Sequence, residues 1–234
     1  LNYLVSSSDN DIRTAAYCID TLIEYDSSGQ IRPGQATEWE YDEASKTWTF
    51  HLREAKWVDN TGTPVADVTA QDYVDAIKYQ LTPEYESGIV QNLFGVIANA
   101  RAYYNGLVYN GGADDEGVVW NAIDFSEVGV KAVDDLTLEY TLVQPTPYFL
   151  SVLNYGCYLP ANGAFMQSCI AEDGTDMFGT DNTKLLYNGA YILSTFEPQG
   201  RRIMTKNPNY WDKDNVFIDA IEETYNKEMD TIAP

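Results

Sequence analysis

The spacing of apolar residues in this chain switches between the period of a helix and the period of a strand. Between residues 11 and 25, apolar residues recur at intervals of three and four, and Asp11 stands where it can cap the first turn. The buried positions expected from this spacing are Ile12, Ala15, Ile19 and Leu22. The segment predicts a helix with one face in a core.

Residues 37–52 have the period of a strand. In TWTFHL, residues 47–52, apolar side chains alternate with polar ones, which predicts a strand with Trp48, Phe50 and Leu52 facing a core. The preceding DEAS fits a hairpin turn, so TEWEYD, residues 37–42, is the expected partner strand, with Trp39 and Tyr41 on one side.

A second helix and two more pairs of strands follow. Thr69 and Asp72 form a capping-box pattern, apolar residues continue on one side, and Pro83 stops the helix. Short alternating strands are predicted on either side of a DD turn within residues 128–145, and a hairpin around PQG within residues 190–208. The expected fold class is therefore α/β to α+β.

The charge of the chain excludes several kinds of partner. Lys and Arg total 14 against 36 Asp and Glu, a formal charge of −22, which repels nucleic acid and anionic lipid head groups. No apolar run approaches the roughly 18 residues of a membrane span. The three cysteines contain no CxxC pair, and Cys18 is expected to be a buried apolar residue.

Residues with catalytic or metal-binding chemistry form no recognisable set in the sequence. His51 is the single histidine and lies on the polar side of a strand, so a structural role is favoured over base or ligand. Pairs of carboxylates could serve a glycosidase, but no spacing selects one pair. Residues 173–182, DGTDMFGTDN, could bind Ca²⁺ or be a turn-rich loop, and the absence of EF-hand spacing favours the loop. We therefore expect no enzyme activity, no metal and no cofactor.

The aromatic residues are interpreted as scaffold. They fall mostly on periodic apolar faces, where burial in a core is favoured over stacking on a ligand. The residues in question are Trp39, Trp48, Trp57, Tyr73 and Trp211. PNYWDKDN, residues 208–215, is expected to be a turn that packs Tyr210 and Trp211 beneath a strand.

The order of these pieces is more specific than any one of them. TWTFHLREAKWVDNTGTPVADVTAQDYV, VGVKAVDDLTLEYTLVQPTPYF and LLYNGAYILSTFEPQGRRIMTKNPNYWDKDNV follow one another along the chain. In sequence and order they resemble the extracellular solute-binding proteins, family 5, which deliver oligopeptides to ABC importers. The similarity looks closest to the streptococcal and clostridial, Gram-positive type and covers nearly the whole chain.

The resemblance implies an architecture. The chain looks like the N-terminal portion of a protein about twice as long, with a periplasmic-binding-protein-like type II lobe, the extra domain of peptide-binding members, and the second ligand-binding lobe absent. Residues 1–26 and 145–234 would belong to one lobe, and residues 27–144 would form the extra domain. The implied protein is a monomeric, extracellular lipoprotein, anchored to the cytoplasmic membrane outside these residues.

The resemblance also implies the function and the ligand-binding residues. Two lobes would close over an oligopeptide and deliver it to ABC permease subunits. Ser6, Ser7, Ser8 and Asp9 match the segment whose main chain pairs with the peptide like an added strand. Tyr85 matches a tyrosine that the extra domain places over the ligand. A polar N-cap loop is the alternative for the segment, and a dipeptide, a metal chelate, an oligosaccharide or a secreted hydrolase are alternatives for the function.

Overall fold

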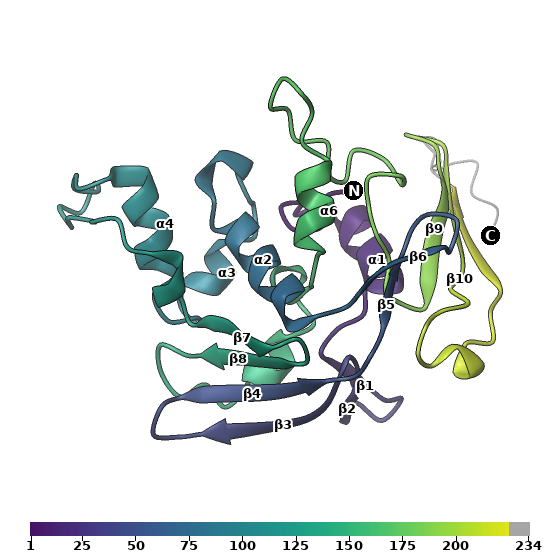
Figure 1. Ribbon diagram of the computed structural model, residues 1–234, viewed down its shortest axis with the longest axis horizontal. Helices are drawn as coiled ribbons and strands as arrows, with labels where there is room; N and C mark the ends of the chain where they lie inside the picture. Colours follow the sequence, from purple (N-terminus) through teal and green to yellow (C-terminus); the bar gives the residue numbers. More distant parts are fainter. Residues whose placement is uncertain (225–234) are drawn as a thin grey trace, which may run out of the picture.

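The computed structural model describes residues 1–224 (Figure 1). Its α-helices are α1 Asp9–Cys18, α2 Ala70–Gln80, α3 Gln91–Phe94, α4 Ala100–Tyr109, α5 Phe149–Val152 and α6 Gly163–Ser168. Short 3₁₀ turns are η1 Pro83–Tyr85, η2 Phe125–Glu127, η3 Gly156–Tyr158 and η4 Lys213–Asn215. No helix within the described residues is both long and apolar enough to cross a bilayer.

A four-stranded antiparallel sheet lies beneath helices α2, α3 and α4 in Figure 1. Its strand order is β3 Ala36–Asp42, β4 Thr47–Leu52, β8 Thr137–Thr141 and β7 Val130–Asp134. Trp39 pairs with Phe50 and Tyr41 with Trp48, and the side chain of Phe50 is completely buried. The two predicted strand pairs in this part of the chain are thereby confirmed, because alternation and turn residues specify a hairpin locally.

The remaining strands form smaller sheets. The predicted hairpin around PQG is β9 Tyr191–Phe196 with β10 Arg201–Lys206, and β11 Ala220–Thr224 pairs with the free edge of β10. Two separate hairpins are β1 Ile23–Tyr25 with β2 Ile31–Pro33, and β5 Lys56–Val58 with β6 Pro64–Asp67.

Helix α2 begins as the sequence predicts. The Asp72 carboxylate accepts a hydrogen bond from the Thr69 amide at 2.8 Å, which completes one half of a capping box. The same carboxylate accepts from the Trp57 indole at 2.9 Å, so one buried side chain holds the helix start and β5 together.

The first predicted helix is wrong in its extent. The sequence predicts a helix over residues 11–25, whereas α1 covers Asp9–Cys18, has Ser8 rather than Asp11 at the N-cap position, and is followed by extended backbone at Ile19. The Asp20 amide donates to Asn188 Oδ1 at 2.9 Å and the Gly189 amide donates to the Cys18 carbonyl at 2.9 Å. Asn188 and Gly189 thus supply the hydrogen bonds at the end of α1 that a longer helix would make within itself, and the chain continues as β1.

The predicted buried face of α1 is partly wrong as well. Ala15, Ile19 and Leu22 are buried, but the side chain of Ile12 is 42% exposed. Ile19 and Leu22 lie beyond the helix, so their burial results from the extended chain and not from a helical stripe.

Two hydrophobic cores organise the molecule. The first lies between the four-stranded sheet and the helices above it, and the second lies among α1, α2, β9 and β10. Helix α2 belongs to both, with Tyr73 and Ile77 in the first core and Ala76 and Tyr79 in the second. The domain boundaries at residues 26/27 and 144/145 stay a prediction.

The aromatic residues expected to be scaffold lie in or against these cores. Trp57 and Tyr73 are buried, and Trp39 and Trp48 pack against the first core as partly buried side chains. Trp211 is partly buried, and the Arg53 guanidinium lies 3.5 Å above its ring.

Candidate functional site

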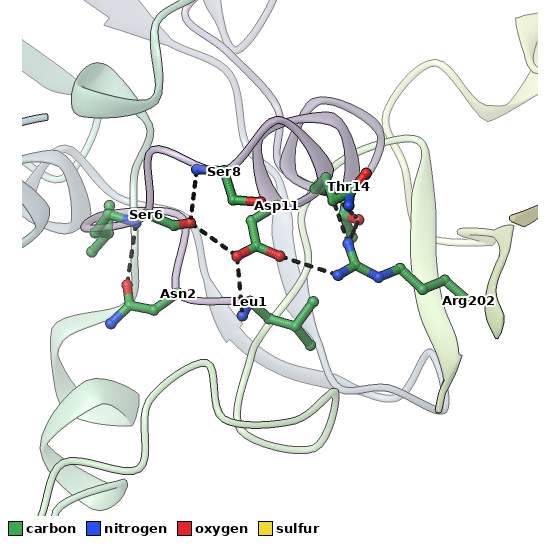
Figure 2. A network of polar contacts seen from close by, with 9 residues as sticks. Leu1, Asn2, Ser6, Ser8, Asp11, Thr14 and Arg202 are labelled. Carbon is green, nitrogen blue, oxygen red and sulfur yellow. Dashed lines mark hydrogen bonds and ion pairs between the residues drawn. The ribbon is translucent and has the colours of Figure 1, made fainter. Parts of the chain in front are cut away.

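The segment Ser6–Asp9 turns the chain into helix α1, and the Ser6 side chain is held by contacts within the fold (Figure 2). The Ser6 hydroxyl donates to Asp11 Oδ2 at 2.9 Å and accepts from the Ser8 amide at 3.1 Å. The Ser8 carbonyl accepts from the amides of Asp11 and Ile12, in the first turn of the helix. Ser8 therefore occupies the N-cap position of α1, but its side chain makes no capping hydrogen bond.

The main chain of the same segment keeps free hydrogen-bonding groups. Within residues 1–224, neither the Ser7 amide nor the carbonyls of Ser6 and Ser7 have a hydrogen-bond partner. Ser7, Ser8 and Asp9 are exposed, and Ser8 has extended backbone angles, φ −75° and ψ 127°. An extended, exposed main chain with free donors and acceptors is what an added strand needs. The assignment of these residues to a ligand stays a prediction.

The turn that carries Tyr85 lies beside this segment. The Gly88 amide donates to the Val5 carbonyl at 2.9 Å, and the Ser87 hydroxyl donates to the Leu4 carbonyl at 3.0 Å. The Tyr85 ring is partly buried and stacks on Tyr79, with ring centroids 3.9 Å apart and an interplanar angle of 12°. The structure thus brings together the two parts of the predicted site, although more than 70 residues separate them in sequence.

A cavity of about 430 Å³ opens one helical turn beyond Ser8. Helix α1 forms one wall, β1 a second, and residues 154–156 and 189–191 the others. Residues of its wall that the sequence analysis did not single out are Ala16, Glu24, Tyr25 and Asn154, and Ile12 was expected to be buried in a core. The exposure of Ile12 is the one signal that could have pointed to it, and that exposure is visible only in the folded chain.

The charged groups of this cavity wall are acidic. Tyr210 donates to Glu24 Oε1 at 3.0 Å and the Trp211 indole donates to Asp20 Oδ2 at 2.7 Å, so the NYWD turn is fixed to the acidic wall. Burial raises the pKa of Asp20 to about 7, although the Trp211 hydrogen bond opposes this shift.

The single histidine and the three cysteines lie in different environments. His51 is exposed on β4, and the three cysteines are free and buried. Burial raises the pKa of the Cys157 thiol to about 12, so this thiol is not a nucleophile at neutral pH. Among residues 1–224, no three His, Cys, Asp or Glu side chains are grouped as a metal ion requires.

The loop at residues 173–182 uses its acidic side chains for its own turns. The Asp173 carboxylate accepts from the Thr175 amide at 3.0 Å, and Asp176 Oδ1 accepts from the Phe178 amide at 2.8 Å. The Tyr79 hydroxyl donates to the other oxygen of Asp176. These contacts favour the turn-rich loop over a Ca²⁺ site.

Comparison with known proteins places the chain in a family. The family model described as bacterial extracellular solute-binding proteins, family 5, matches residues 30–233. The chain belongs to this family. Its members are solute-binding proteins, as the sequence resemblance indicated.

Individual family 5 relatives agree. The oligopeptide-binding protein SarA of Streptococcus gordonii is 37% identical over 229 residues, which cover 96% of this chain and 31% of SarA. A crystal structure of an oligopeptide ABC transporter substrate-binding domain from Bacillus anthracis superposes with a TM-score of 0.79 at 29% identity, covering 96% of this chain and 39% of that one. The structure of Listeria monocytogenes OppA bound to peptide superposes with a TM-score of 0.75 at 25% identity, covering 96% of this chain and 40% of that one.

These solved structures confirm the predicted fold, a lobe of the type found in oligopeptide-binding proteins. The chain spans about a third of the length of the curated relatives it matches.

Proposed function

We propose that this chain supplies one wall of an oligopeptide-binding site in the extracellular solute-binding component of an ABC importer. The main chain of Ser6–Asp9 pairs with the peptide as an added strand, and Tyr85 contacts the ligand from the neighbouring turn. The cavity under α1 accommodates a peptide side chain. The protein performs no catalysis and passes the peptide to membrane permease subunits from a lipid-anchored position at the cell surface.

The observation that carries the proposal is the free Ser7 amide together with the free carbonyls of Ser6 and Ser7. The relatives that match 96% of this chain are named as oligopeptide-binding proteins. The Ser6 side chain is engaged within the fold, whereas these three main-chain groups have no hydrogen-bond partner within residues 1–224. Recognition through backbone groups ignores the identity of peptide side chains. The geometry therefore favours a binder that tolerates many sequences.

The test compares peptides with matched N-methylated versions. We expect short peptides of varied sequence to bind, and methylation of one main-chain amide to weaken binding by about five- to a hundredfold. This range corresponds to one hydrogen bond lost with a buried partner, about 1–3 kcal/mol. Titration calorimetry on the protein as its gene encodes it gives both affinities.

The position of the methyl group provides the control. Methylation at alternate amides distinguishes strand pairing from side-chain recognition, because successive amides of an added strand point in opposite directions. Equal affinity for every methylated peptide would contradict main-chain pairing, and failure of all peptides to bind would contradict the proposed function.

A further inference from the structure

Arg202 on β10 reaches across to the first turn of α1 (Figure 2). One guanidinium nitrogen, Nη1, donates to the Asn10 carbonyl and to Thr14 Oγ1, each at 2.7 Å. The other, Nη2, donates to Asp11 Oδ1 at 3.2 Å. One side chain therefore satisfies three acceptors of α1 from a strand that is 188–192 residues away in sequence.

Asp11 transmits this contact to the candidate ligand segment. One carboxylate oxygen pairs with Arg202, and the other accepts from the Ser6 hydroxyl at 2.9 Å. Ser6 Oγ in turn accepts from the Ser8 amide at 3.1 Å. Figure 2 shows this unbroken series from Arg202 through Asp11 and Ser6 to Ser8.

The placement of Arg202 is not explained by the helix alone. A cation near the N-terminus of a helix opposes the helix dipole, so its position there must be favoured by the acceptors around it. The side chains of Arg202 and Asp11 are only 20% and 17% exposed, which strengthens a charge-assisted bond relative to a surface pair. A lysine could not reach the same three acceptors, because its ammonium lacks the planar fork of arginine.

We infer that Arg202 is a positioning residue, which holds the main chain of Ser6–Ser8, with Ser8 extended, in the conformation offered to a ligand. The inference rests on the proposed function and deepens it. Fixing the backbone of a residue costs about 1–2 kcal/mol at 25 °C, and a segment ordered before the ligand arrives does not impose that cost on binding. The free Ser7 amide lies at the centre of the segment that Arg202 orders.

The neighbouring Arg201 provides a matched control. It lies on the same strand and carries the same charge, but it contacts Glu197 at 3.1 Å and Glu222 at 3.8 Å, within its own sheet. Arg201→Met and Arg202→Met therefore change the net charge equally, and only the second removes the contact with α1.

The test measures peptide affinity and amide hydrogen exchange on the protein as its gene encodes it. We expect Arg202→Met to bind peptide about tenfold or more weakly and to exchange faster at residues 8–12. Arg202→Lys should lie between Arg202→Met and the parent in both affinity and exchange rate, because lysine keeps the charge but lacks the planar guanidinium. Arg201→Met should match the parent in both measurements, and exchange in the β3–β4 hairpin should be unchanged in all variants.

Ser6→Ala supplies a second variant that leaves Arg202 in place. It breaks the series between Asp11 and Ser8, so it should reproduce the faster exchange at Ser8 and the weaker binding, even if Arg202→Met fails to fold. Equal exchange and equal affinity in Arg201→Met, Arg202→Met and Ser6→Ala would overturn the inference. A parent that binds no peptide would instead contradict the proposed function, and the exchange measurement would still decide whether Arg202 orders the segment.

Discussion

Asp20 is a buried carboxylate where the chain leaves α1. Its side chain is 5% exposed and accepts from the Trp211 indole at 2.7 Å and from the Thr21 amide at 3.2 Å. Two hydrogen bonds and the charge of Arg53 favour the ionised form, but burial outweighs them and the pKa rises to about 7. Asp20 therefore links the pH of the medium to the stability of the fold.

The stability contributed by Asp20 should decrease as the pH rises. An unfolded Asp titrates near pH 3.9, so between about pH 4 and pH 7 the folded protein keeps a proton that the unfolded chain releases. The contribution is full below pH 4 and is lost through pH 7. Asp20→Asn removes this contribution. The free energy of unfolding of the parent minus that of the variant should therefore fall by on the order of 2–4 kcal/mol as the pH rises from about 4 to 7.

Urea unfolding at a series of pH values measures this difference. Glu40→Gln is the control, because Glu40 is exposed on β3. The free energy of unfolding of the parent minus that of this variant should not fall as the pH rises. A difference for Asp20→Asn that stays constant from pH 4 to pH 8 would show that Asp20 is ionised throughout.

Among the elements, the link between α1 and β9 depends on the NGAY motif at residues 188–191. Asn188 Oδ1 accepts a hydrogen bond from the Asp20 amide, and the Gly189 amide donates one to the Cys18 carbonyl. A Cβ atom on Gly189 would lie 2.6 Å from the carbonyl carbon of Cys18, closer than backbone atoms allow. The glycine is needed because the backbones of the two elements touch there.

Gly189→Ala should therefore destabilise the protein, since α1 and β9 must move apart. We expect a loss of about 1–3 kcal/mol, the usual cost of overpacking, seen as a lower midpoint of urea unfolding. Gly95→Ala is the matched control, because nothing lies within 4 Å of a Cβ atom there. Equal midpoints for the two variants would contradict the close approach.

At the scale of the whole chain, the charge of −22 should bias which peptides reach the proposed site. Such a field attracts cationic peptides and repels anionic ones before any contact forms. We expect a Lys-rich peptide to associate faster than a Glu-rich peptide of equal length in low salt. At about 1 M salt, where the Debye length is about 3 Å, the two rates should converge.

Stopped-flow association rates at low and high salt test this. The salt comparison is its own control, because contacts inside the site are screened far less than long-range attraction. A rate difference that persists unchanged in high salt would assign the preference to the site and not to the overall charge.

Elements whose signals are local could be predicted from the sequence. Alternation predicts the β3–β4 hairpin because neighbouring residues specify its burial pattern, and the Thr69–Asp72 capping box predicts the start of α2 because both partners lie within one turn. The ordered motifs indicated the family because they too can be read from short runs of neighbouring residues. It also directed attention to Ser6–Asp9 and Tyr85, whose roles stay predictions.

Features that depend on distant partners could not be predicted. The end of α1 is set by Asn188 and Gly189, and the apolar spacing of residues 19–25 suits a buried extended chain as well as a helix. The exposure of Ile12 and the reach of Arg202 to Asp11 arise only when α1 packs beside β9 and β10. Periodicity reports which residues avoid water, whereas the tertiary contacts determine what covers them and where a helix stops.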